Sequence, residues 1–179
     1  MNAPADMAAF PLRTMVAKEK AWVEARIQQA FADAPGDSPI ERIFYTGLWA
    51  ELAHRAYLHG DLRLLPTLNR GDGPAAGLAT DAYYIEPQVQ VRNRRVDFVF
   101  WAHDGVRWNR LLIECDGHDY HERTKKQATN DRSFDRESQY FGDTVFRFTG
   151  SEIYNSLQRC VDDVLRWADR QRGEVAVNG

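Results

Sequence analysis

Carboxylates lie inside two of the most apolar segments of this 179-residue chain. Asp97 stands within residues 96–101, and Glu114 and Asp116 follow residues 111–113. Acidic side chains are rarely buried unless they are paired with a cation or bind a metal ion. A fold that buries these two segments therefore has to supply positive charge to the three carboxylates.

The spacing of apolar residues and helix breakers predicts eight elements around these acids. Helices are expected over residues 14–32, 39–59, 121–141 and 151–172, and strands over residues 84–91, 95–102, 110–115 and 144–148. Ser38, Pro39 and Glu41 form a capping-box pattern at the start of the second helix. Residues 60–82 predict a long loop. The order α-α-β-β-β-α-β-α predicts an α/β fold, a mixed four-stranded sheet flanked by helices.

Strand geometry predicts where the acids point. Glu114 and Asp116 are two residues apart, so they share one face of a strand. Asp104 and Gly105 predict a turn between the second and third strands. With a loop of even length, Asp97 pairs with Glu114 or lies one pair away on the same face. We therefore expect the three carboxylates to converge at one end of the sheet.

Converging carboxylates indicate a divalent metal site. Oxygen ligands suit Mg²⁺, for which Mn²⁺ can substitute. A metal ion held there lowers the pKa of a bound water and stabilises the charge of a phosphodiester transition state. Two structural alternatives remain open: Asp97 pairs with an arginine such as Arg95, and Asp116 belongs only to a turn.

The charges of the chain give opposing indications about whether it binds nucleic acid. The net charge of −3 weighs against nucleic acid, because phosphate contacts dominate such binding. Two basic clusters that flank the acids weigh for it, although a solvated surface explains any one of them. They comprise Arg92, Arg94 and Arg95, and Arg123, Lys125, Lys126, Arg132 and Arg136.

Composition is that of a folded protein, with 44% hydrophobic and 27% charged residues. No apolar run approaches the roughly 20 residues of a membrane span. Two cysteines are too few for a disulfide framework, and no secretory signal is expected. We expect a cytoplasmic protein without a membrane partner. Residues 38–172 are expected to form the main domain, with an N-terminal segment and helix (1–37) packed on it and a flexible tail (173–179).

The chain resembles the PD-(D/E)XK nuclease superfamily, in a branch similar to very-short-patch-repair endonucleases. The resemblance covers roughly residues 38–153. It is carried by Glu41, Asp97, Glu114-Cys115-Asp116-Gly117, His118, His121, Asp131, Asp135, Gly142 and Val145-Phe146-Arg147-Phe148. It implies a restriction-endonuclease-like fold and a Mg²⁺-dependent endonuclease acting on DNA, in repair or defence.

The expected site follows from both lines of reasoning. Asp97, Glu114 and Asp116 are the expected metal ligands and catalytic residues, and the resemblance adds Glu41; His121 is expected as a base or phosphate ligand. Phosphate contacts are expected from Arg147, Arg95, Lys125 and Lys126. An ion pair with a sheet carboxylate is the alternative for Arg147.

Three positions depart from the resemblance. Asp116 occupies the superfamily's lysine position, a cation that Lys125 or Lys126 of the next helix would supply. Phe134 stands where the branch predicts a basic residue, and Ser138 where it predicts an aliphatic one.

Other readings of the same residues stay open. Cys115, His118 and His121 have a spacing compatible with zinc, although a fourth ligand is not evident. The chain could also be a non-catalytic nucleic-acid-binding module, or a subunit whose activity needs a protein partner for targeting.

Overall fold

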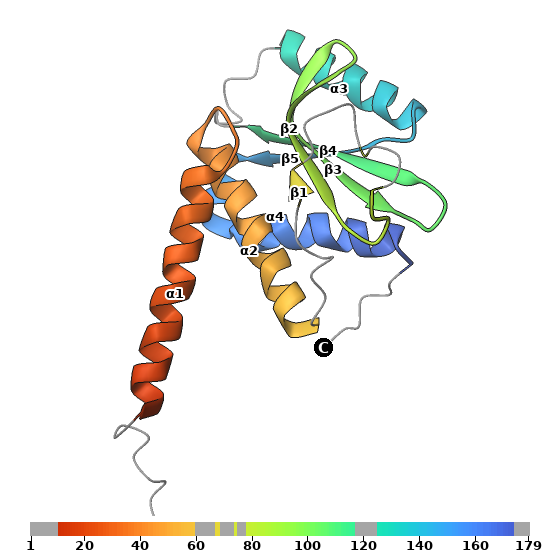
Figure 1. Ribbon diagram of the computed structural model, residues 1–179. Coiled ribbons are helices and arrows are strands. Elements are labelled where there is room, and N and C mark those ends of the chain that lie inside the picture. Colours follow the sequence, from red (N-terminus) through yellow and green to blue (C-terminus); the bar gives the residue numbers. More distant parts are fainter. Residues whose placement is uncertain (1–10, 60–66, 69–73, 75–77, 117–124, 174–179) are drawn as a thin grey trace, which may run out of the picture. The chain divides into compact units, whose positions relative to one another are not determined.

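The computed structural model describes residues 11–59, 67–68, 74, 78–116 and 125–173 (Figure 1). It divides the chain into two units, Met1–Ala34 and Pro35–Gly179. The described part of the first unit is largely the helix α1 (Pro11–Asp33). The sheet and the remaining helices belong to the second unit, which contains all the contacts described in this subsection and at the candidate site. The expected packing of the N-terminal segment and the expected flexible tail stay predictions.

The second unit contains the other predicted elements in the predicted order, together with one short strand, β1, that was not predicted. They are α2 (Pro39–His59), β1 (Thr67–Leu68), β2 (Tyr84–Val91), β3 (Arg94–His103), β4 (Trp108–Asp116), α3 (Lys125–Tyr140), β5 (Thr144–Thr149) and α4 (Gly150–Gln171). One expectation is corrected. Residues 60–82 are not loop throughout, because β1 lies among them and adds a short fifth strand beside β2.

The sheet is mixed and has the order β1-β2-β3-β4-β5. Strands β2, β3 and β4 form an antiparallel meander, in which Phe98 pairs with Ile113. Strand β5 runs parallel to β4, because the chain crosses over between them through α3. The α/β class and the mixed sheet predicted from the sequence are therefore confirmed.

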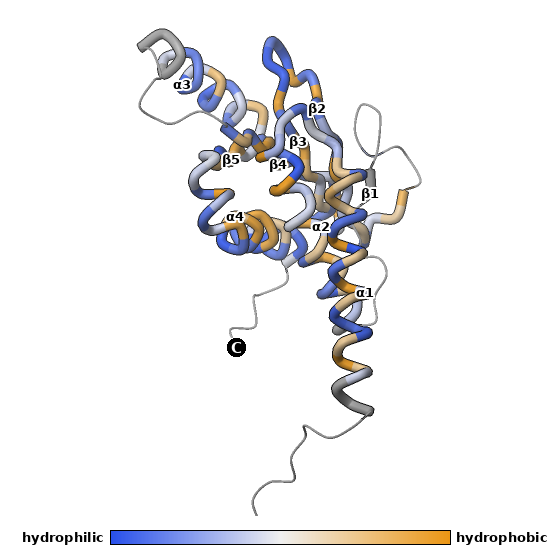
Figure 2. Tube along the Cα trace, turned by 90° about the vertical axis from the view of Figure 1, so that its left-hand side faces the viewer, coloured by the Kyte–Doolittle hydropathy of each residue, from blue (hydrophilic) through white to orange (hydrophobic). Residues whose placement is uncertain are grey.

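Helices cover both faces of the sheet (Figure 1). On the face of α2 and α4, Phe44 of α2 lies 6.0 Å from Phe98 between ring centroids, and Trp167 of α4 lies 6.4 Å from Phe100. Figure 2 shows the apolar residues of α4 gathered on the side toward the strands. On the opposite face, called the α3 face below, Phe134 of α3 completes a buried cluster formed by Val91, Val96, Val99 and Leu112.

Two helices begin with side-chain caps that satisfy backbone N–H groups. At α2, the Glu41 N–H donates to Ser38 Oγ (3.3 Å), and Glu41 Oε2 accepts from the Asp37 N–H (2.9 Å). At α4, Thr149 and Glu152 form a reciprocal capping box. Among the described residues, no helix is long and apolar enough to cross a membrane.

Gly36 lies before α2 with a φ of +137°, a region that residues with a Cβ rarely adopt. A Cβ added there would lie 2.8 Å from Glu41 Cβ and 3.1 Å from Glu41 Oε2. We expect Gly36→Ala to lower the free energy of unfolding by about 1–3 kcal/mol, measured by urea denaturation. Gly105 is the control, since its φ is +93° but a Cβ there meets nothing within 4 Å. Equal losses in the two variants would contradict a special role for the contact with Glu41.

Candidate active site

The regular alternation of side chains is interrupted at Gln88 and Asp97. Val96 and Val99 are both buried in the cluster on the α3 face, whereas residues three apart on a regular strand point to opposite faces. The ladder between β2 and β3 skips Gln88 and Asp97, and Gln88 has a positive φ of 54°. The alternation of side chains between the two faces of the sheet is therefore broken at Asp97. The expectation that Asp97 shares a face with Glu114 was based on that alternation, and this basis is corrected.

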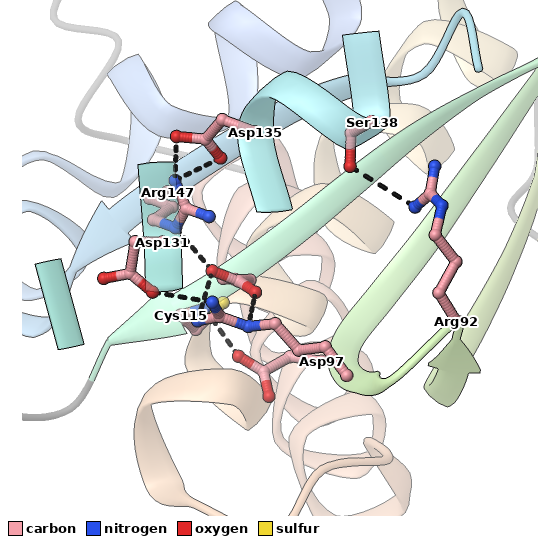
Figure 3. Close-up of polar contacts among 9 residues, drawn as sticks. Arg92, Asp97, Cys115, Asp131, Asp135, Ser138 and Arg147 are labelled. Atoms are coloured by element: carbon pink, nitrogen blue, oxygen red, sulfur yellow. Dashed lines mark hydrogen bonds and ion pairs between the residues drawn. The ribbon is translucent and has the colours of Figure 1, made fainter. Parts of the chain in front are cut away.

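Asp97 nevertheless lies next to Glu114. Its Oδ2 accepts a hydrogen bond from the backbone N–H of Cys115 at 2.6 Å (Figure 3). Burial raises the pKa of Asp97 to about 6; the bond from Cys115 lowers it, and the charges of Glu41 and Glu114 raise it further. Asp97 is thus a partly buried carboxylate within the field of two other acids.

The alternative in which Arg95 pairs with Asp97 is not what the structure shows. The Arg95 guanidinium binds Asp37 at 2.9 Å, and both side chains are more than half exposed. Arg95 still lowers the pKa of Asp97, but it does so less than the burial and the neighbouring acids raise it. Its expected phosphate contact stays a prediction.

Glu41 is buried at the start of α2, with 6% of its surface exposed. Besides capping the helix, its Oε2 accepts a hydrogen bond of 2.5 Å from Gln88 Nε2. The amide oxygen of Gln88, Oε1, is buried without a hydrogen-bond partner among the described residues. Glu41 therefore joins the N-terminus of α2 to the interrupted part of the sheet, within electrostatic reach of Asp97.

Glu114 is held between two arginines, Arg94 and Arg147. Arg94 of β3 approaches Glu114 Oε1 with Nε at 2.6 Å and donates to Oε2 from Nη2 at 3.0 Å. Arg147 of β5 donates to Oε2 from Nε at 2.5 Å. The Glu114 side chain is only 5% exposed, so these charge-assisted contacts neutralise a nearly buried carboxylate.

Helix α3 fixes the far side of each arginine. Arg94 Nη1 binds Asp131 at 2.6 Å, and Arg147 Nη1 binds Asp135 at 2.7 Å. We call these five residues the Glu114 network. It contains three carboxylates and two guanidinium groups, and therefore carries one net negative formal charge.

The surroundings of Arg147 favour its charged form. Burial works against the charge of Arg147, but Glu114 and Asp135 outweigh it and raise the pKa of this guanidinium above its ordinary value. Two roles were considered for Arg147. One of them, an ion pair with a sheet carboxylate, is present in the structure. Its phosphate contact stays a prediction.

The remaining expected residues lie at or beyond the edge of the described region. Asp116 ends β4 and is paired in register with Thr149 of β5. His121 lies outside the described residues, as does His118. Lys125 is the first residue of α3, but its side chain and that of Lys126 are not among those described.

Within the described residues, no group of three His, Cys, Asp or Glu side chains is placed to hold a metal ion. In this arrangement, two guanidinium groups contact the Glu114 carboxylate. The roles of Asp97, Glu114 and Asp116 as metal ligands therefore stay predictions.

The structure explains the phenylalanine at position 134, for which the sequence alone gave no reason. It is buried on the α3 face, and the guanidinium carbons of Arg94 and Arg92 lie 5.2 and 5.7 Å from its ring centroid. Where the resemblance predicts a basic residue on α3, the positive charge comes from the β2–β3 hairpin. Ser138, also fully buried, accepts a hydrogen bond from Arg92 at 3.4 Å.

Sequence reasoning missed two participants in the site, Gln88 and Arg94. Nothing in the sequence marks Gln88, because a positive φ is more usual for Gly or Asn. Arg94 was visible only as one member of a basic cluster. The i, i+4 spacing of Asp131 and Asp135 on a helix was a usable signal that two acids would face one partner surface.

The pKa of Asp97 predicts how stability depends on pH. The folded-state pKa is about 6 against an ordinary 3.8, so the folded state binds the proton more tightly than the unfolded state. The stability that this protonation contributes is present below pH 4 and lost as the pH rises through 6. Asn cannot ionise but keeps an acceptor for the Cys115 N–H.

We therefore expect Asp97→Asn to be more stable than the wild type at pH 7.5, by about 1 kcal/mol after discounting for partial exposure. The difference should shrink at pH 4.5, as measured by urea unfolding. Asp104→Asn is the control of opposite sign: hydrogen bonds from Asn109, Arg107 and Val106 lower the pKa of Asp104 to about 2. That variant should lose stability at pH 7.5, and a loss in Asp97→Asn as well would contradict the interpretation.

Comparisons with models of protein families, with curated proteins and with solved structures found no significant match to this chain. No family is therefore shown, and the superfamily resemblance stays a prediction from the sequence. The function has to be inferred from the residues that the fold brings together around Glu114.

Proposed function

We propose that the chain is a metal-dependent endonuclease that hydrolyses phosphodiester bonds in DNA, on a restriction-endonuclease-like fold. One observation carries the proposal. Asp97 binds the peptide N–H next to Glu114, and Glu114 in turn binds Arg94 and Arg147. Carboxylates suited to a hard cation and guanidinium groups suited to phosphate thus lie in one cluster.

The buried position of these groups supports a functional role for them. Asp97 sits where the sheet ladder is interrupted, beside the positive φ of Gln88. Burial and two neighbouring glutamates oppose its charge, and Arg95 offsets their effect only in part. Groups held in such unfavourable surroundings are concentrated at active sites, because function rather than stability maintains them.

The residues of this chain have separable tasks in the proposed reaction. Arg94 and Arg147 bind and orient the scissile phosphate through their forked donors. Asp97, with Glu41 beside it, would hold Mg²⁺ through carboxylate oxygens, and Glu114 would join them if it were not held by the arginines. The attacking water needs a proton acceptor, for which His121 and the carboxylates are the candidates.

We expect Asp97→Asn and Glu114→Gln each to reduce cleavage of plasmid DNA in Mg²⁺ or Mn²⁺ by roughly 100-fold or more. The matched control is Asp163→Asn, which removes an exposed ion pair with Arg166 on α4 and should cleave like the wild type. Circular dichroism confirms that each variant is folded. Undiminished cleavage by Asp97→Asn would place the active site elsewhere.

The neutralised state of Glu114 also favours a second candidate, a non-catalytic nucleic-acid-binding module or partner-dependent subunit on the same fold. In that case the arginines are structural, and DNA binding depends on salt but not on a chelator. Binding measured by fluorescence anisotropy with and without EDTA separates the two. A chelator-sensitive affinity counts against the non-catalytic reading.

A further inference from the structure

Helix α1 carries most of the large apolar side chains that are exposed in the described part of the chain. Six of those eleven side chains lie on this helix, although it contributes only 23 residues. They are Met15, Val16, Trp22, Val23, Ile27 and Phe31, with exposed fractions from 38% to 68%. Helices in proteins draw most of their stability from burying an apolar face. The helix therefore requires a surface that covers these side chains.

The six side chains share one side of α1. Residues three, four or seven positions apart lie on the same side of a helix. Val16, Val23, Ile27 and Phe31 follow this spacing, and Met15 and Trp22 form a second row beside them. We call the surface formed by these two rows the α1 face. Figure 2 shows hydrophobic residues recurring along α1 between hydrophilic ones.

Two opposite charges, Glu19 and Arg26, lie within the α1 face and are seven positions apart. The residues three and four positions before and after Glu19 are all apolar: Met15, Val16, Trp22 and Val23. The Arg26 guanidinium lies over the ring of Trp22, with its central carbon 4.9 Å from the ring centroid. Among the described residues Glu19 forms no ion pair, whereas the adjacent Lys20 binds Glu24 at 3.7 Å. A surface that covers the α1 face therefore also has to match one negative and one positive charge.

These two charges distinguish between the ways in which the α1 face can pack against a second copy of itself. In a parallel pair in register, each Glu19 would face the other Glu19 and each Arg26 the other Arg26. Like charges opposed in an apolar interface are costly. In an antiparallel pair, the twofold axis can pass between Trp22 and Val23, midway between the two charges. Each Glu19 then faces Arg26 of the second copy, and the symmetry forms this ion pair twice.

We propose that the α1 face binds the α1 face of a second copy of this chain, in an antiparallel pair that contains two Glu19–Arg26 ion pairs between the copies. The apolar side chains supply the affinity, and the charges set the orientation and register of the two helices. The inference is independent of the proposed nuclease function, because it uses no residue of the Glu114 network.

The competing occupant is the main domain of the same chain, on which the sequence predicted that the N-terminal helix packs. The charge pattern favours the second copy. An apolar face needs no internal charges to pack on its own domain, whereas a face that carries Glu19 and Arg26 at equal distances from its centre is complementary to itself. Packing on the same chain predicts a monomer, so the oligomeric state separates the two occupants.

The experiment measures self-association of the whole chain by sedimentation velocity from about 1 to 100 µM, because dimerisation depends on concentration. We expect the wild type to convert from monomer to dimer in this range. Glu19→Arg and Arg26→Glu should each weaken association by about tenfold or more, since each places like charges opposite one another. The double variant should associate like the wild type, and so should an equimolar mixture of the two single variants.

Lys18→Glu is the matched control. It also reverses one exposed charge of α1, but Lys18 is five positions from Val23 and so lies on the other side of the helix. This variant should associate like the wild type. Val23→Asp, which places two carboxylates beside the twofold axis, should abolish association. Circular dichroism confirms that each variant keeps its helices.

Three results would overturn the inference. A wild-type chain that stays monomeric at the highest concentration would exclude a second copy as the occupant. A dimer that neither single charge reversal weakens would place the interface elsewhere or make the pair parallel, since a parallel pair only exchanges one like-charge contact for another. A double variant that associates as weakly as the single variants would contradict the pairing of Glu19 with Arg26.

Discussion

The nearly buried carboxylate of Glu114 is the constraint on which the arrangement of this site depends. A charge at that depth requires opposite charge with good hydrogen-bond geometry. Arg94 and Arg147 supply it from the strands on either side of β4, and Asp131 and Asp135 then balance the arginines from α3. One charged side chain is thus linked through ion pairs to three strands and a helix.

Much of the fold could be predicted because it follows from local patterns. The apolar strands, the breaker residues and the cap at Ser38 predicted the element order correctly. The turn at Asp104 and Gly105 also predicted the register of β3 against β4 well, since Phe98 pairs with Ile113. The two-residue strand β1 was missed because so short a segment has no periodicity.

The site was less predictable, because its geometry depends on one local irregularity. Parity assumes that every residue of a strand advances the pleat by one step. That assumption fails at Asp97, since Val96 and Val99 are buried in one cluster, and the ladder between β2 and β3 is interrupted there beside the positive φ of Gln88. The sequence could therefore identify Asp97 and Glu114 as unusual acids, but not which cations surround them. That required the spatial pairing of Arg94 with Glu114, twenty positions apart.

Helix α3 is attached to the sheet with little apolar surface. Of its described side chains, Phe134 is buried and Tyr140 is exposed, and the other inward contacts come from Asp131, Asp135 and Ser138. Ion pairs between partly exposed groups weaken as salt rises, whereas apolar contacts do not. The free energy of opening α3 alone therefore responds to ionic strength more steeply than global unfolding, which the core beneath α2 and α4 dominates. A helix attached in this way detaches locally while the remaining fold stays intact.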